Sequence, residues 1–275
     1  MKCFAPWFSV NGGGSRPMSC GDCIGCRLNY AREWSIRCWH EAQLHDVNSF
    51  VTLTYRDAPL SLEYRDFQLF MKRLRKWYRG EVRFYMCGEY GDNNGRAHFH
   101  ACLFGVRFPD LVYHSTTAAG FKLYVSAKLE QLWGHGFCTV GDVTLESAGY
   151  CARYVGVYTG NAKIMEIVDV DTGEIHQRVR PFARMSLRPG IGSRWYDRFK
   201  ADVYPHGAVV VNGVEVAPPK YYDRKFRSNN FPAYSRMLLA RDIRSRAAIP
   251  ESFPGRVEAH LAVKRAQLSS LHRDV

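Results

Sequence analysis

The sequence predicts an α+β fold with a central antiparallel sheet in the order β-α-β-β-α-β, followed by one more helix and a basic C-terminal segment. Three observations predict it. The run FVTLTY (50–55) is rich in β-branched and aromatic residues, as buried strands are. An amphipathic stretch of helical period follows it. Two apolar runs, at 81–89 and 98–105, then flank a turn-rich segment and predict a hairpin. This order predicts a sheet with its helices on one face.

The first predicted helix covers residues 27–45. Small and apolar residues recur there at helical spacing: Leu28, Ala31, Ser35, Cys38 and Ala42. The strand at 50–55 is ended by Asp57-Ala58-Pro59, because proline and aspartate disfavour a continued strand. The second helix is predicted to begin after Ser61 as its N-cap and to end at Gly80. Its apolar face holds Phe67, Phe70, Met71, Leu74, Trp77 and Tyr78.

The remaining elements of the core are a helix at 124–133, a strand at 137–143 and a helix at 145–159. Farther on, Asp171-Thr172-Gly173 and Asn212-Gly213 predict two hairpin turns, and Ala217-Pro218-Pro219 predicts a break. Four regions are therefore expected. They are a Cys-rich segment with a helix (1–48), a core (49–160), a hairpin-rich extension (161–220) and a basic helical tail (221–275).

The charge of the chain favours a polyanionic partner. Its 275 residues carry 38 Lys and Arg against 26 Asp and Glu, a formal net charge of +12. The tail at 221–275 contributes 11 basic against five acidic residues, or +6, and is either a surface that contacts the DNA backbone or a pair of solvated helices. No apolar run approaches the roughly 18 residues of a membrane helix, and the opening MKCFAPWFSV does not fit a signal peptide, so a cytoplasmic location is expected.

His98 and His100 predict a metal site. Residues two apart on a strand share a face, so both imidazoles point to one side while Phe99 and Ala101 turn into the core. Glu89 ends the partner strand of the hairpin and is near enough to add a carboxylate. Two imidazoles and a carboxylate suit Mg²⁺ or Mn²⁺ with positions open for phosphate oxygens.

Tyr150 and Tyr154 lie four residues apart on a predicted helix, so their phenols stack on one face. Both are candidate covalent nucleophiles that can reach the same phosphate, provided that a nearby cation polarises it, because an ordinary tyrosine is protonated at neutral pH. The alternative is an aromatic stripe that packs the helix onto the sheet, which Tyr158 would continue.

Cys20, Cys23 and Cys26 have the spacing of metal thiolates in a reducing compartment. Zinc is the expected metal, and Cys3, Cys38 or His40 is the expected fourth ligand of a tetrahedral site. Three free thiols in a loop are the alternative.

Taken together, FVTLTY, HFHACLF and YCARY resemble, in order and spacing, the three motifs of the HUH endonuclease superfamily of replication initiators and relaxases. Longer stretches, among them MSCGDCIGCRLNYAREWSIRCWHEA, FYMCGEYGDNNGRAHFHACLFG, RPGIGSRWY and YYDRKF, resemble the replication initiators of gokushovirus-type microviruses over residues 18 to about 227.

The resemblance implies a site-specific endonuclease and ligase for single-stranded DNA at the origin of rolling-circle replication, working with host helicase and polymerase. Tyr150 and Tyr154 would alternate through a 5′-phosphotyrosine, while His98, His100 and Glu89 bind metal. Relatives usually carry a lysine shortly after the second tyrosine, where this chain has Val157 and Tyr158, so Arg153 or Lys163 is the expected DNA-binding substitute. The rivals are a non-catalytic, zinc-stabilised DNA-binding protein and a relaxase or transposase of the same superfamily.

Overall fold

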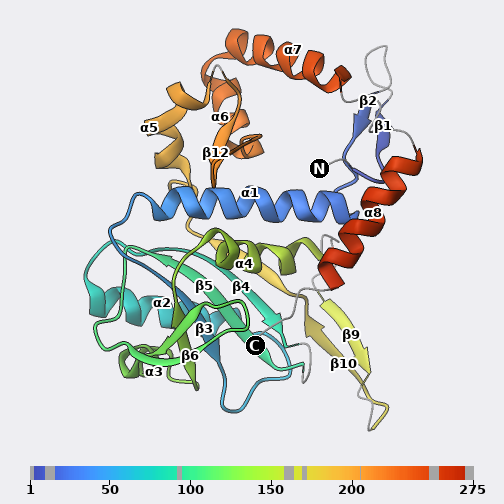
Figure 1. Ribbon diagram of the computed structural model, residues 1–275. Helices are drawn as coiled ribbons and strands as arrows, with labels where there is room; N and C mark the ends of the chain where they lie inside the picture. The colour runs from blue at the N-terminus through green and yellow to red at the C-terminus, as the bar shows by residue number, and fades with distance from the viewer. Residues whose placement is uncertain are drawn as a thin grey trace.

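A seven-stranded sheet, antiparallel throughout, lies at the centre of the computed structural model (Figure 1). The structure describes residues 3–9, 16–91, 95–157, 164–168, 172–204, 206–247 and 254–269. The order of the strands is β11-β4-β5-β3-β8-β7-β6. Their bounds are β3 Asn48–Thr54, β4 Arg83–Tyr90, β5 Ala97–Phe104, β6 Val112–Thr116, β7 Lys122–Val125, β8 Cys138–Gly141 and β11 Phe182–Met185.

Helices cover both faces of this sheet, so the prediction of helices on one face was wrong (Figure 1). On one face, α2 (Tyr64–Tyr78) and α3 (Ala127–Trp133) pack against Leu53, Phe99 and Ala101. On the other, α1 (Ile24–Ala42) and α4 (Leu145–Val157) pack against Tyr85 and Phe104. Every residue of β5 is buried, and a strand buried on both sides needs a layer on each face. The expected inward turn of Phe99 and Ala101 is confirmed.

The predicted order of elements is confirmed with one addition, a β6–β7 hairpin inserted before α3. Tyr124 therefore lies in β7 and not at the start of a helix. The helix predicted from Ser61 begins after Glu63, because the Ser61 hydroxyl accepts a hydrogen bond from the Val179 amide at 2.9 Å. That helix ends at Arg79, which takes the left-handed conformation (φ 55°) one residue before Gly80. Residues 158–159 of the last predicted core helix lie outside the described residues.

Three two-stranded hairpins stand apart from the main sheet in the described part of the chain. Two were predicted from their turns: β9 (Ile164–Val168) with β10 (Ile175–Val179), and β12 (Val209–Val211) with β13 (Val214–Val216). The second turns through Asn212 and Gly213, both at positive φ, as a tight two-residue turn requires. The third joins β1 (Trp7–Ser9) to β2 (Arg16–Met18) and was not predicted.

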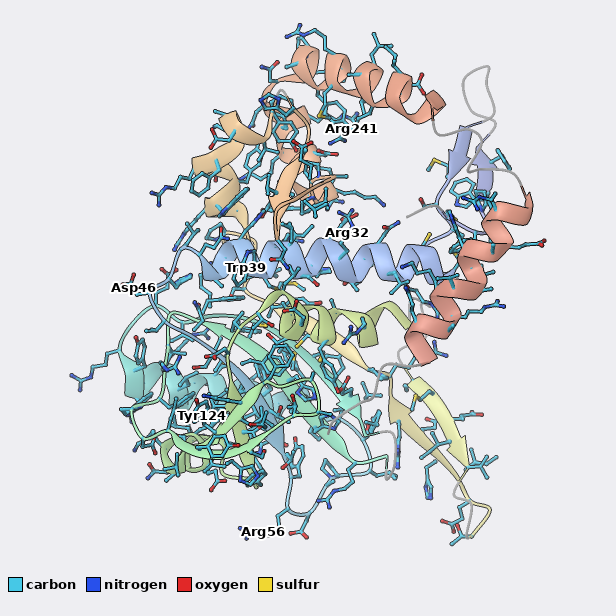
Figure 2. All side chains as sticks on the ribbon, in the orientation of Figure 1. Arg32, Trp39, Asp46, Arg56, Tyr124 and Arg241 are labelled. Carbon is cyan, nitrogen blue, oxygen red and sulfur yellow. The ribbon has the colours of Figure 1, made fainter. Side chains whose placement is uncertain are left out.

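The C-terminal third of the chain adds α5 (Ser193–Val203), α6 (Lys220–Asn229), α7 (Phe231–Ala247) and α8 (Pro254–Ser269). Helix α5 was not predicted. A separate core around Tyr196 and Tyr222 holds α5, α6 and the β12–β13 hairpin against α1. Figure 2 shows Arg32 reaching from α1 toward this hairpin, where its guanidinium donates to the Ala217 carbonyl at 2.9 Å. No helix of the described residues is long and apolar enough to cross a bilayer.

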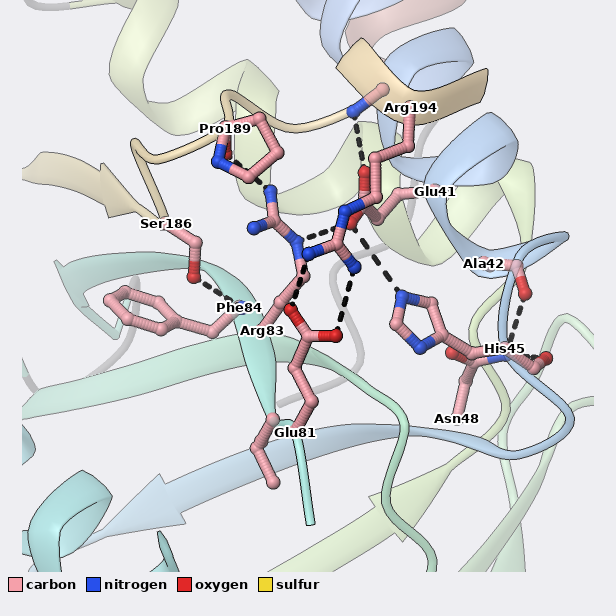
Figure 3. A network of polar contacts seen from close by, with 12 residues as sticks. Glu41, Ala42, His45, Asn48, Glu81, Arg83, Phe84, Ser186, Pro189 and Arg194 are labelled. Atoms are coloured by element: carbon pink, nitrogen blue, oxygen red, sulfur yellow. Dashed lines mark hydrogen bonds and ion pairs between the residues drawn. The ribbon is translucent and has the colours of Figure 1, made fainter. Parts of the chain in front are cut away.

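A buried ion pair fastens α1 to the edge of the sheet (Figure 3). The Glu41 carboxylate accepts hydrogen bonds from the Arg83 guanidinium and, at 2.7 Å, from the Gly192 amide. Arg83 also donates to the Pro189 carbonyl at 2.6 Å. Burial works to raise the pKa of Glu41, but the bonds from His45, the Gly192 amide and Arg83 outweigh it and hold this pKa below its ordinary value. The carboxylate is therefore ionised inside the protein.

Candidate metal and tyrosine site

Glu89, His98 and His100 come together on the face of the sheet that α1 and α4 cover. The register of β4 with β5 places Glu89 opposite His98, and His100 follows two residues later on the same face. His98 Nε2 lies 3.1 Å and His100 Nε2 lies 3.0 Å from the same oxygen, Glu89 Oε1. All three side chains are buried, and their ligand atoms lie within 4.8 Å of one another. The hairpin therefore presents a carboxylate and two imidazoles to a single point.

The outer nitrogen of each ring has a partner that orients it. His100 Nδ1 lies 2.9 Å from the Thr52 hydroxyl on β3, and His98 Nδ1 lies 3.0 Å from the Arg96 carbonyl. Such second contacts fix a metal-binding imidazole with its other nitrogen turned inward. Thr52 was missed from the sequence, although it alternates with Leu53 in FVTLTY and so shares the face of His100.

Two buried atoms at this point have unmet bonding capacity among the described residues. Glu89 Oε2 has no hydrogen-bond partner there, and His100 Nε2 meets Glu89 Oε1 at ion-pair distance without the geometry of a hydrogen bond. An unpaired buried polar atom costs roughly 1–3 kcal/mol, so a ligand is expected to satisfy it.

The protonation states at this point suit a cation. Burial lowers the pKa of His100 and favours the neutral ring that binds metals. Burial opposes the ionisation of Glu89, but its contacts with His100 and His98 outweigh that effect and lower its pKa. A carboxylate beside two imidazoles is a donor set that fits Mg²⁺ or Mn²⁺.

Tyr150 reaches the same point from α4. Its hydroxyl donates to Glu89 Oε1 at 3.3 Å, and its ring meets that of His100 edge to face, with centroids 4.9 Å apart. The guanidinium of Arg153, one helical turn later, lies 5.7 Å from the centroid of the Tyr150 ring. The backbone of Tyr154 continues α4, but its side chain and the whole of Lys163 lie outside what the structure describes.

Four cysteines form a second cluster at the N-terminal end of α1. The sulfurs of Cys3, Cys20, Cys23 and Cys26 all lie within 4.8 Å of one another. Three of the distances are 3.5 Å (Cys3–Cys20), 3.8 Å (Cys3–Cys23) and 3.9 Å (Cys20–Cys26). A tetrahedron with zinc–sulfur bonds of about 2.3 Å has sulfur–sulfur edges of about 3.8 Å. The arrangement therefore has the size of a four-thiolate zinc site.

Backbone amides point at these sulfurs. Cys20 Sγ accepts from the amides of Asp22 (3.4 Å) and Cys23 (3.2 Å), and Cys23 Sγ accepts from Phe4 (3.3 Å). The amides of Cys23 and Asp22 lower the pKa of Cys20, which favours the thiolate that metals require. Of the three candidates for the fourth ligand, the structure brings Cys3 to the cluster. Cys38 is buried beside the sheet, and the ring of His40 stacks on Trp195.

Comparisons with known proteins give related matches. The sequence profile of a family of replication-associated proteins, described under the name ORF2, matches residues 48–157. Replication-associated protein VP4 of Bdellovibrio phage phiMH2K is 36% identical over 223 residues, which are 77% of this chain and 68% of that protein. Replication-associated protein ORF2 of Spiroplasma virus 4 is 29% identical, over 75% of this chain and 66% of its own. Replication-associated protein ORF4 of Chlamydia phage 1 is 27% identical, over 82% and 60%. No solved structure matches.

Proposed function

Because the chain belongs to the family of phage replication-associated proteins, we propose that it initiates rolling-circle replication by nicking and rejoining single-stranded DNA at the origin. The observation that supports this most directly is the Tyr150 hydroxyl, held 3.3 Å from the carboxylate that the two imidazoles share. A nucleophile and a cation site then face one phosphate position.

In the proposed reaction, the Tyr150 oxygen attacks the scissile phosphorus. The bond from phosphorus to the 3′ oxygen breaks, which leaves a 5′-phosphotyrosine and a 3′-hydroxyl. The phenol proton leaves along the hydrogen bond to Glu89, and the departing 3′ oxygen takes up a proton. A divalent cation, Mg²⁺ or Mn²⁺, held by Glu89, His98 and His100 would polarise the phosphate and neutralise charge that develops on it. One ester bond replaces another, so rejoining needs no nucleotide cofactor.

We assign to Tyr154 the second nucleophile, which cleaves the regenerated origin so that the released 3′-hydroxyl can close the circle. Arg153 and Lys163 are the proposed contacts to DNA phosphates. The proposal places the reaction in residues 49–160 and the added DNA contacts in the basic tail 221–275, with the host helicase and polymerase as partners in the host cytoplasm.

The covalent adduct tests this function. We expect that incubation with circular single-stranded microvirus DNA and Mn²⁺ gives a protein–DNA adduct that survives a denaturing gel. Tyr150→Phe and Tyr154→Phe should each retain part of it, whereas the double variant should lose it entirely. Tyr234→Phe on α7 is the matched control and should behave as wild type.

If tight DNA binding is seen without an adduct under any divalent metal, the rival function, a non-catalytic DNA-binding protein, replaces this one. An adduct that forms on duplex transfer-origin or transposon-end DNA in preference to the phage circle would indicate a relaxase or transposase.

We also propose that the cluster of Cys3, Cys20, Cys23 and Cys26 holds a structural zinc ion that orders the first 26 residues. Metal analysis of the purified protein is expected to give about one equivalent of zinc. Cys23→Ser should lower the zinc content at least several-fold, because a closed structural site needs its four ligands. Cys138→Ser, which alters a buried cysteine beneath α3, is the control that should keep its zinc. Less than a tenth of an equivalent in the wild type would contradict the zinc site.

A further inference from the structure

An open cavity of about 450 Å³ lies where β3 ends, at the same end of the sheet as His98. Its lining comes from the end of β3, from α3 and from the loop that leads into β8: Tyr55, Arg56, Glu130, Gly134, His135, Gly136 and Phe137. Figure 2 shows Arg56 at the end of the molecule farthest from α7. None of these residues has a role in the reaction proposed above.

The register of the sheet ties the cavity to the metal site. Thr54 on β3 pairs with His98 on β5, and on its other side the Thr54 amide donates to the Phe137 carbonyl at 3.1 Å. His98, Thr54 and Phe137 therefore form one row across neighbouring chains, with their side chains on one face. At about 4.8 Å from strand to strand, the backbone of Phe137 is about 10 Å from that of His98.

Phe137 presents an aromatic ring to solvent on that face. The residue is 46% exposed, and its ring packs against His114 of β6 with centroids 5.4 Å apart. The loop before it hugs β3, because a Cβ on Gly136 would lie 2.5 Å from the Arg56 amide. Backbone thus forms the wall behind the ring, while the exposed Arg56 adds a positive charge at the rim. An aromatic platform with a neighbouring cation is how proteins hold single-stranded nucleic acid.

We propose that Phe137, with His114 behind it, stacks on a base of the single-stranded DNA close to the nick, and that Arg56 contacts a phosphate beside that base. The inference rests on the proposed function, because it names the part of the DNA that this face receives. Stacking is tolerant of sequence, so the subsite holds the strand in place and does not read a particular base.

The test is the binding of a labelled poly-dT oligonucleotide in EDTA, which separates DNA binding from nicking. Phe137→Ala is expected to bind about tenfold more weakly, and Phe137→Trp within about twofold of wild type. Phe231→Ala removes a ring that is 60% exposed on α7 and should leave affinity unchanged. Arg56→Gln should reduce the slope of log affinity against log salt by about 0.7, the value for one phosphate contact on a single strand.

A second measurement needs no variant. Photocrosslinking of the wild type to an oligonucleotide that contains 5-iododeoxyuridine should label the peptide that carries Phe137. Wild-type affinity in Phe137→Ala, or labelling confined to other peptides, would overturn the subsite while leaving the nicking function intact. A wild type that binds no single-stranded DNA would overturn both.

Discussion

Replacing His98 and His100 together by Ala is expected to reduce nicking about a thousandfold while most of the affinity for DNA remains. Loss of the cation removes several kcal/mol of stabilisation of charge in the transition state, and each 1.36 kcal/mol is a factor of about ten in rate. Affinity persists because it comes chiefly from phosphate contacts made by basic side chains, of which this chain has 38 Lys and Arg.

The measurement is single-turnover cleavage of the phage circle across a Mn²⁺ titration, with oligonucleotide binding followed in parallel. His206→Ala, which removes an exposed imidazole from the segment between α5 and β12, is the control and should cut as wild type does. Nicking that stays metal-dependent and undiminished in the double variant would refute the assignment of the cation to this hairpin.

The largest effect on stability is expected from Arg83→Met, which keeps the length of the side chain but removes its charge. Glu41 would then be an unpaired carboxylate at 0% exposure, and breaking a buried ion pair by removal of one partner costs about 3–5 kcal/mol. For a chain of this size the melting temperature should fall by about 6 to 20 °C.

A matched control lies in the same network (Figure 3). Arg194 forms a two-pronged ion pair with Glu81, but both side chains are about half exposed, so Arg194→Met should cost less than about 1 kcal/mol. Because the pKa of Glu41 is lowered on folding, the pair stabilises the protein above the ordinary carboxyl pKa of about 4.3, and this contribution is lost as the pH falls through the lowered value. Thermal unfolding from pH 7 to pH 3 checks both statements. Equal melting temperatures for the two variants would contradict the buried pair.

Local patterns predicted the hairpin and the amphipathic helix well, because a single segment carries each signal. The period of two in HFHACLF was enough to place His98 and His100 on one side and Phe99 on the other. Turn residues likewise predicted the turn at Asn212-Gly213, where positive φ is required.

Features that depend on distant segments could not be predicted in this way. The coverage of both sheet faces depends on where α1 packs, and no pattern within residues 27–45 states that partner. Cys3 joins its cluster across 17 residues, a distance that leaves it equivalent in the sequence to Cys38 or His40. The segment at 122–125 alternates too briefly to be told from the start of the following helix, which hid β7.

The pairing of β4 with β5 makes the site an all-or-nothing arrangement. A slip of one residue between the two strands would turn both imidazoles to the opposite side and offer Phe99 and Ala101 to the carboxylate in their place. No intermediate register holds part of the site, since side chains alternate with a period of two. Insertions and deletions within these strands are thus forbidden one residue at a time, and variation in length in this part of the chain is confined to the turn at 91–96.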